Sequence, residues 1–331
     1  MNILIKPQLD YPVGSNSLPG KHDYVDQIWG AHLLQTFREL RHNAYFIQKN
    51  QIEPYSVSNI DGYDVLIFDE ITSFYQDKEY SISLLKSFKG IKVLYIPTFT
   101  PDYPEITSLF DYIFVADSHL NILKWEQFHS HVKILPIIWH APLSEFIDND
   151  LTNPYTDTLF KIVYFGIVRD VYLNTMIRLA NDGEQVYFGG MYYSKENKWI
   201  NTIPQDRIDS FPSNLHMVTN GTFECGTQYR WMRYANLGLV FYPANWPGAV
   251  SHKIVEYLCC GTRCLIEEPC PNAYRAVQLD GGIVFPFRDY DSLYKAIQQE
   301  KMLFYNKNEL QKLARDTFSM KNVCQTIVES I

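Results

Sequence analysis

Short runs of apolar residues alternate along the chain with longer stretches in which apolar side chains recur every three or four positions. The runs NILIKP (2–7) and YDVLIFDE (63–70) are rich in branched and aromatic residues, which predicts buried strands. The stretch 24–43 between them carries apolar residues at helical spacing, for example Ile28 and Leu34. Nearly continuous apolar strands separated by helices are typical of a parallel sheet that is covered on both faces.

This pattern is interrupted over 139–158, where WHAPLSEFIDNDLTNPYTDT is dominated by turn-forming Pro, Asn and Asp. A second series of strands and helices then runs from FKIVYFG (160–166) to GGIVFPF (281–287). The fold class that we predict is therefore α/β, with two Rossmann-like parallel-sheet domains facing a central cleft. A ligand is expected at the carboxyl ends of the strands.

Composition narrows the class of protein. The chain has 331 residues, of which 46% are hydrophobic, and a formal net charge of −8, which argues against a protein that coats nucleic acid or an anionic membrane. A local basic cleft is compatible with that total. The six cysteines form no CxxC pair, no apolar run is long enough to span a membrane, and the chain opens with the strand-like MNILI. These features predict a soluble cytoplasmic protein without a metal site.

Two junctions between strands and turns in the second half are candidate phosphate sites. Gly166 ends one strand and Arg169 follows it, so that the backbone can approach a ligand and a guanidinium can pair with phosphate oxygens. Gly190 ends the next strand. A turn glycine with a surface arginine explains the same residues. The G-x-G-x-x-G fingerprint and the P-loop pattern are both absent, which disfavours dehydrogenases and P-loop nucleotidases.

The segment WPGAVSHKIVEYLCCG (246–261) is the third junction. Ser251 suits the N-cap of a helix whose backbone N–H groups can bind an anion, and Lys253 adds a cation there. Glu256 lies three residues beyond Lys253 on the same helical face. The two side chains can form a surface ion pair, or the carboxylate can accept hydrogen bonds from a sugar diol. A carboxylate in an otherwise apolar stretch is costly to bury without a partner, which favours the second interpretation.

The segment SHKIVEYLCCGTRCLIEE (251–268), together with FGIVRD and QVYFGG, resembles the donor-binding region of GT-B glycosyltransferases, in particular the group-1 and spore-maturation types of the glycogen-phosphorylase-like clan. The resemblance implies an N-terminal acceptor domain over 1–145 and a donor domain over 146–310. It also implies a helix over 311–331 that crosses back to the first domain. The implied substrate is a nucleotide diphosphate sugar, with a UDP- or GDP-sugar expected.

The resemblance also implies roles for individual residues. Glu256 would hold the ribose hydroxyls, and Arg169 and Lys253 would neutralise the phosphates. Backbone donors to the phosphates would come from four consecutive residues: Gly248, Ala249, Val250 and Ser251. Many retaining members carry a second Glu eight positions before the ribose-binding one, and that position holds Gly248. The stereochemical outcome therefore stays open.

The first half offers a loop after its first strand, VGSNSLPGKHD (13–23), where Gly14 would approach the donor. His22 and Asp23 are candidates for the base that deprotonates the acceptor hydroxyl, although a solvated polar loop explains them equally. His119 and His140 are weaker candidates at strand ends. We expect a metal-independent transferase whose leaving group is stabilised by cations and helix N-termini.

Two rival functions are compatible with these residues. One is a nucleotide-sugar epimerase or hydrolase on the same fold, and the other is a non-catalytic nucleotide-binding module, which the missing carboxylate at Gly248 would suit. The acceptor of a transferase is not identified by the sequence; a glycan, lipid, protein or modified nucleobase would each fit, and the oligomeric state is equally open.

Overall fold

The apolar runs form the strands of two parallel sheets, which belong to two units of the chain. Unit 1 comprises residues 1–140, 245–250 and 318–331, and unit 2 comprises 141–244 and 251–317. The computed structural model describes residues 1–7, 25–47, 56–57, 59–69, 74, 77–96, 107–116, 132–142, 147–148, 150–194, 199–221, 226–243 and 250–331.

Unit 1 contains a seven-stranded parallel sheet with the order β3-β2-β1-β4-β5-β6-β7. Its strands are β1 (Asn2–Lys6), β2 (Asn43–Ile47), β3 (Ser56–Val57), β4 (Val65–Asp69), β5 (Ile91–Ile96), β6 (Tyr112–Ala116) and β7 (Lys133–Ile137). Its longer helices are α1 (Val25–Glu39), α3 (Lys78–Ser87) and α14 (Met320–Ser330).

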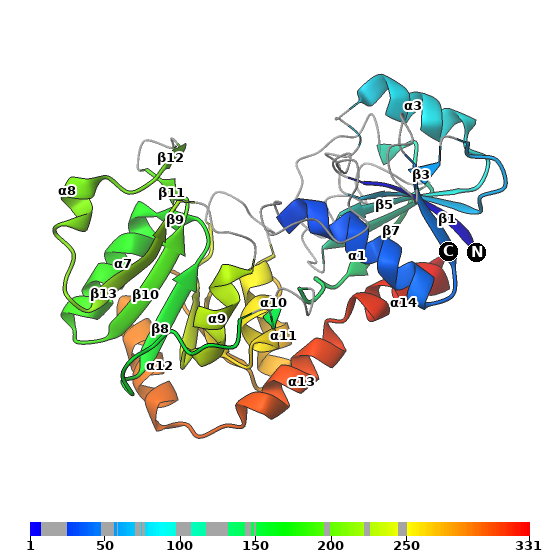
Figure 1. Ribbon diagram of the computed structural model, residues 1–331. Helices are drawn as coiled ribbons and strands as arrows, with labels where there is room; N and C mark the ends of the chain where they lie inside the picture. Colours follow the sequence, from blue (N-terminus) through cyan, green and yellow to red (C-terminus); the bar gives the residue numbers. More distant parts are fainter. Residues whose placement is uncertain are drawn as a thin grey trace. The chain divides into compact units, whose positions relative to one another are not determined.

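Helices cover both faces of this sheet, as the continuous apolar strands predict. On one face α1 and the C-terminal helix α14 lie side by side and share a core with alternate residues of the strands (Figure 1). Ile327 of α14 and Phe37 of α1 are fully buried in that core. On the other face α3 contributes Leu84 and Leu85 to a second core. The last residues of the chain are therefore an integral part of unit 1.

Unit 2 contains a six-stranded parallel sheet with the order β13-β10-β8-β14-β15-β16 and a small three-stranded sheet with the order β12-β11-β9. The strands are β8 (Lys161–Phe165), β9 (Val168–Arg169), β10 (Gln185–Gly190), β11 (Tyr192–Tyr193), β12 (Trp199–Asn201), β13 (Leu215–Asn220), β14 (Leu237–Val240), β15 (Arg263–Glu267) and β16 (Gly282–Phe285). The helices are α7 (Asp170–Asn181), α8 (Gln205–Ile208), α9 (Thr227–Tyr234), α10 (His252–Cys259), α11 (Ala273–Gln278), α12 (Tyr290–Met302) and α13 (Lys307–Thr317).

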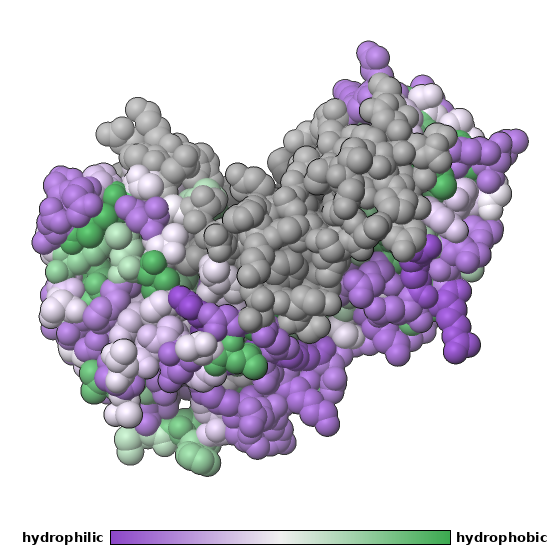
Figure 2. Space-filling view, in the orientation of Figure 1, coloured by the Kyte–Doolittle hydropathy of each residue, from purple (hydrophilic) through white to green (hydrophobic). Residues whose placement is uncertain are grey.

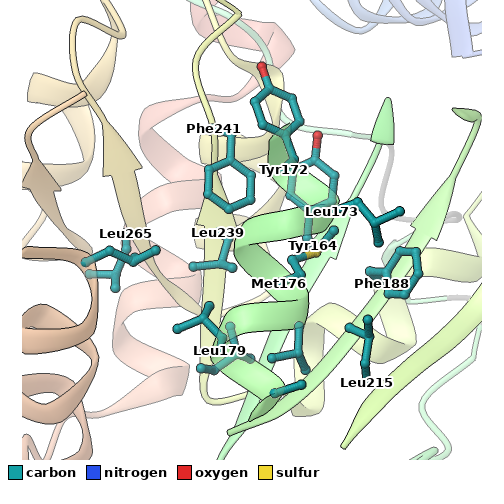
Figure 3. Close-up of a cluster of buried hydrophobic side chains, with 14 of the residues drawn as sticks. Tyr164, Tyr172, Leu173, Met176, Leu179, Phe188, Leu215, Leu239, Phe241 and Leu265 are labelled. Atoms are coloured by element: carbon teal, nitrogen blue, oxygen red, sulfur yellow. The ribbon is translucent and has the colours of Figure 1, made fainter. Parts of the chain in front are cut away.

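One hydrophobic core of unit 2 joins one face of the sheet to α7 and α12. Leu173, Met176 and Leu179 recur at helical spacing along α7 and point into this cluster (Figure 3). Tyr172 stacks on Phe241, which follows β14, with ring centroids 4.9 Å apart. The predicted α/β class with two Rossmann-like parallel-sheet domains is confirmed.

The strand order of unit 2 identifies where a ligand is expected. From β8 the chain proceeds outward through β10 to β13, and it then returns to β14, on the other side of β8, and proceeds through β15 to β16. The order therefore reverses between β8 and β14. Parallel sheets of this kind bind ligands outside the carboxyl ends of the strands at such a switch point.

The most exposed hydrophobic side chains of the described residues lie elsewhere in unit 2. Met302, the last residue of α12, is 87% exposed, and Phe304, in the loop that joins α12 to α13, is 99% exposed. Figure 2 shows green side chains at this loop, at the lower end of unit 2. The carboxyl ends of β8 and β14 have no comparable cluster of exposed apolar side chains among the described residues.

Candidate functional site

Two glycines join the ends of β8 and β10 through their backbones. Gly166 follows β8 with a φ of 137°, and Gly190 ends β10 with a φ of 139°, a conformation that residues with a Cβ rarely adopt. The Gly166 N–H donates to the Gly189 carbonyl at 3.0 Å, and a Cβ on Gly190 would overlap the Gly166 carbonyl group. The backbone conformation and contacts at both predicted site positions therefore require glycine.

Lys253, in the first turn of α10, lies against Gly166 at the carboxyl end of β8. A Cβ on Gly166 would come within 2.8 Å of the Lys253 ammonium nitrogen. That nitrogen lies 5.8 Å from the centroid of the Tyr164 ring, within cation–π range. Burial lowers the pKa of Lys253, and the carboxylate of Glu256 opposes this change. The structure thus brings together two predicted site residues, Gly166 and Lys253, from distant parts of the sequence.

Glu256 is a buried carboxylate with few partners. Only 6% of the residue is exposed, so the interpretation of Lys253 and Glu256 as a surface ion pair is wrong. The Tyr229 hydroxyl donates to Glu256 Oε1 at 3.2 Å, and no described lysine or arginine lies within 4.0 Å of the carboxylate. Burial raises the pKa of Glu256 to about 7, although Lys253 and the Tyr229 hydroxyl act in the opposite direction. Its oxygens therefore retain capacity to accept hydrogen bonds.

Tyr257, the neighbour of Glu256, anchors α10 to the sheet. Its hydroxyl donates to the Val163 carbonyl at 3.2 Å and accepts from the Phe165 N–H at 3.3 Å, so it links the helix to β8. Gly238 in β14 leaves the space for this ring, because a Cβ there would come within 2.6 Å of it. These contacts hold Lys253 and Glu256 at the switch point between β8 and β14.

Ser251 occupies the N-cap of α10, but its side chain does not cap the helix. The Asn272 side chain, which precedes α11, holds the backbone of Ser251 instead. Its Oδ1 accepts from the Ser251 N–H at 2.9 Å, and its Nδ2 donates to the Ser251 carbonyl at 3.0 Å. The start of α10 is therefore positioned by a residue that local helix signals do not identify. Val250 directly precedes this cap.

Arg169 is the N-cap residue of α7. It pairs with Tyr193 in the short parallel contact between β9 and β11, and its guanidinium lies 4.8 Å from the centroid of the Tyr193 ring. The guanidinium is also close enough to lower the pKa of Tyr164, which burial raises well above its ordinary value. Since Lys253 also faces the Tyr164 ring, the two predicted cations lie on the same part of unit 2.

Six of the residues selected from the sequence lie outside the described residues: Gly14, His22, Asp23, His119, Gly248 and Ala249. Their roles stay predictions. Among the described residues, Tyr229 is the contact of Glu256 that the sequence did not identify. Its helix, α9, buries Tyr229 and Met232 on one face, but no local spacing relates a tyrosine there to a glutamate in α10.

His140 belongs to the core of unit 1. It is 2% exposed, the Tyr95 hydroxyl lies 3.2 Å from its Nδ1, and the His32 ring packs against it edge to face at 5.7 Å. Burial, assisted by His32, lowers the pKa of His140 well below 6.5, and burial lowers that of His32 to about 4. Both rings are therefore neutral at physiological pH, which suits packing better than proton transfer.

Among the described residues, no group of three or more His, Cys, Asp and Glu side chains is arranged to hold a metal ion. Within the same ranges, every helix is too short or too polar to cross a bilayer.

No family model matches the chain, and no curated protein sequence matches it. Solved structures do match. HepE from Anabaena, in complex with UDP-glucose, aligns with a TM-score of 0.60 and 12% identity over 100% of this chain and 99% of HepE. Sucrose-phosphate synthase from Thermosynechococcus elongatus aligns with a TM-score of 0.59 and 11% identity over 99% and 97% of the two chains.

A DNA-modifying enzyme, beta-glucosyltransferase, aligns with a TM-score of 0.56 and 16% identity over 100% of this chain and 99% of that enzyme, whose substrate is uridine diphosphoglucose. Each alignment extends over both sheets. The fold that the resemblance implied is thereby confirmed, and the chain has the GT-B fold of these glycosyltransferases, built from two Rossmann-like domains.

Proposed function

We propose that this protein is a glycosyltransferase that moves a sugar from a nucleotide diphosphate sugar to a hydroxyl acceptor. The observation that carries the proposal is the buried Glu256 carboxylate, with one phenol as its hydrogen-bond donor, beside Lys253 at the switch point of the unit 2 sheet. A buried carboxylate with unused acceptor capacity suits the two hydroxyls of a ribose, as acidic residues do in dinucleotide-binding folds.

In the proposed reaction the bond between the anomeric carbon and the β-phosphate oxygen breaks, and the electron pair stays on the departing diphosphate. The acceptor oxygen forms the new bond to carbon and gives its proton to a base, for which His22 and Asp23 are the candidates. Lys253 and Arg169 stabilise the charge that develops on the diphosphate. Because these two cations can neutralise the leaving group, we propose that the enzyme needs no metal ion.

UDP-sugars are the first donors to test, because the structures of HepE and of the beta-glucosyltransferase involve uridine diphosphoglucose. A modified nucleobase is one candidate acceptor, since one structural neighbour modifies DNA. The formal charge of −8 does not favour a DNA-binding protein, and a glycan, lipid or protein acceptor also fits. An epimerase or hydrolase would act on the same donor and need no acceptor.

Thermal shift and calorimetric titration with UDP-, GDP-, ADP- and TDP-sugars test the donor site, because a ligand that binds only the folded chain stabilises it. We expect one of them to bind, and Glu256→Ala to weaken that binding at least about tenfold. Glu309→Ala is a matched control, because Glu309 is exposed on α13, and it should bind as the wild type does. Equal affinities in all three proteins would exclude the ribose role of Glu256.

Metal independence has its own test, which is release of the nucleoside diphosphate from the bound donor in the presence of EDTA. We expect the rate to be unchanged. A loss of activity that added Mg²⁺ or Mn²⁺ restores would contradict the proposal that Lys253 and Arg169 suffice.

A further inference from the structure

Tyr172 carries a buried hydroxyl that lacks an ordinary hydrogen bond. The residue lies in the first turn of α7, is 2% exposed and stacks on Phe241 with an interplanar angle of 15°. Its hydroxyl has no hydrogen-bond partner of ordinary geometry among the described residues. Buried polar groups are nearly always paired, so a buried tyrosine without a partner is a candidate for contact with a ligand.

Two guanidinium groups accompany this hydroxyl. Arg288 lies over the Tyr172 ring at 5.1 Å from its centroid. Burial raises the pKa of Tyr172, whereas the positive charges of Arg169 and Arg288, together with the approach of the Arg288 guanidinium to the hydroxyl, act to lower it. A buried hydroxyl beside the Arg288 guanidinium, and under the influence of the Arg169 charge, is suited to an anionic partner, because the phenol donates a hydrogen bond and the guanidinium groups supply charge.

Arg288 is held firmly in this position. Its backbone N–H donates to Glu267 Oε1 at 2.9 Å, and its guanidinium approaches the same oxygen at 3.5 Å. Glu267 also accepts from the Tyr242 N–H at 2.8 Å, so one buried carboxylate links the segments that follow β14 and β16. The φ of Arg288 is 57°, a left-handed conformation that a residue other than glycine adopts at a cost.

These groups lie at the edge of the sheet where the predicted phosphate-binding residues are found. Phe241 follows β14, Glu267 ends β15, and Arg288 comes shortly after β16. Figure 3 shows the hydroxyl groups of Tyr172 and Tyr164 at the same end of the cluster, and the Lys253 ammonium faces the Tyr164 ring. Lys253 of α10 and Arg288 of the segment before α12 therefore each lie over one ring of this pair of tyrosines, and the charge of Arg169, the N-cap residue of α7, acts on both.

We propose that Tyr172 and Arg288 bind the phosphate groups of a nucleoside diphosphate, in addition to Arg169 and Lys253. The Tyr172 hydroxyl donates to a phosphate oxygen, and the Arg288 guanidinium neutralises charge on the same group. This proposal rests on the proposed function, because it names further residues for the same donor site. It adds a neutral hydrogen-bond donor and a third cation to those that the sequence suggested.

A neighbouring cavity offers a different place for an anion. A space of about 260 Å³ between α7 and α12 is lined by Arg178 as well as by Arg288. Arg178 lies 3.6 Å from the centroid of the Tyr290 ring, and its side chain is 59% exposed. An anion in that cavity would depend on Arg178 and Arg288 together, whereas the proposed phosphate site depends on Arg288 and Tyr172.

The experiment is calorimetric titration of the full-length protein with UDP, GDP and ADP, and with the corresponding nucleosides. Tyr172→Phe removes only the hydroxyl, and Arg288→Gln removes the charge; Arg288→Lys restores it. The matched controls are Tyr290→Phe, whose hydroxyl bonds to Asp182 at 2.6 Å, and Arg178→Gln. We expect Tyr172→Phe and Arg288→Gln each to weaken nucleoside diphosphate binding about tenfold or more. Nucleoside binding, the melting temperature of Tyr172→Phe and the affinities of both controls should not change.

The outcomes separate the two proposals. If the wild type binds no nucleoside diphosphate, the proposed function fails. If the wild type binds and both Tyr172→Phe and Arg288→Gln bind equally well, only the role of Tyr172 and Arg288 is overturned. Equal losses in Arg178→Gln and Arg288→Gln would assign the anion to the cavity between α7 and α12, which also overturns it. Partial recovery in Arg288→Lys supports a role of charge.

Discussion

Unit 2 buries two glutamates to the same extent but surrounds them differently. Glu256 and Glu300 are each 6% exposed. Glu300 accepts from Arg263 Nε at 2.8 Å and from Nη2 at 3.0 Å, a two-point pairing that matches the carboxylate to the guanidinium. Glu256 accepts from one phenol at 3.2 Å. Low exposure alone therefore does not distinguish a structural carboxylate from one that is available to a ligand.

The positions of the two carboxylates in the sheet agree with this distinction. Arg263 is the first residue of β15, so its pair with Glu300 lies at the amino-terminal edge of the sheet. Glu256 is on the helix that follows β14, at the edge where ligands bind in parallel sheets. The amino-terminal edge of the sheet thus holds the closed ion pair of Arg263 and Glu300, and the carboxyl-terminal edge holds the incompletely paired Glu256.

The largest effect is expected from breaking the closed pair. Arg263→Met leaves Glu300 buried without its cation, so the free energy of unfolding should fall by about 3–5 kcal/mol in urea titrations. The double variant Arg263→Met with Glu300→Leu should recover most of this loss, because both charges are then removed. Nucleotide binding by the double variant should equal that of the wild type. A double variant as unstable as the single one would show that the ion pair is not the cause.

The pH dependence of stability should report the burial of the Glu256 carboxylate. Burial raises the pKa of Glu256 from 4.5 to about 7, so between these values the folded chain retains a proton that the unfolded chain has lost. The stability contribution of Glu256 is therefore fully present below pH 4.5 and is lost as the pH rises to 7, by about 3 kcal/mol in all. The measurement is urea unfolding of the wild type and of Glu256→Gln across this range.

The difference in stability between the wild type and Glu256→Gln isolates the contribution of Glu256 from that of His252. Burial and the charge of Lys253 lower the pKa of His252, so its contribution to stability has the opposite sign. The stability advantage of Glu256→Gln over the wild type should grow as the pH rises from 4.5 to 7 and then level off. A difference that stays constant with pH would mean that Glu256 keeps an ordinary pKa in the folded chain.

The smallest effect is expected from the single hydrogen bond to Glu256. Tyr229→Phe removes the phenol that stabilises the ionised carboxylate, so the pKa of Glu256 should rise further and stability at pH 8 should fall by about 1 kcal/mol. Tyr290→Phe, which removes a surface hydrogen bond to Asp182, is the control and should change stability less. A Tyr229→Phe protein with an unchanged pH profile would show that Tyr229 does not influence Glu256.

Local patterns in the sequence were sufficient to predict the sheets and part of the site. The apolar run at 160–166 forms β8 over Lys161–Phe165, and the helix that Ser251 was expected to begin is α10 over His252–Cys259. Glu256 is the one acid in an otherwise apolar helical stretch, which predicted a buried carboxylate, and the residue is buried.

Contacts between distant residues could not be predicted in this way. Asn272 holds the backbone of Ser251, and Tyr229 donates to Glu256, through side chains that meet only after the strands have assembled. Arg288 belongs to the segment between β16 and α12, where no periodic pattern marks a side chain as significant. The two glycines Gly166 and Gly190 were recognised, but their mutual backbone contact was not.

The place of α14 in unit 1 has a consequence for how the chain is made. Met320, Val323 and Ile327 fill the same core as Phe37 and the strands near the N-terminus. During synthesis, the face of the unit 1 sheet that α1 covers in part stays incompletely covered until α14 has left the ribosome, whereas every residue of unit 2 has by then been translated. The unit that begins first is completed last, and a ribosome that stalls within the final helix would release a chain whose first sheet lacks part of its cover.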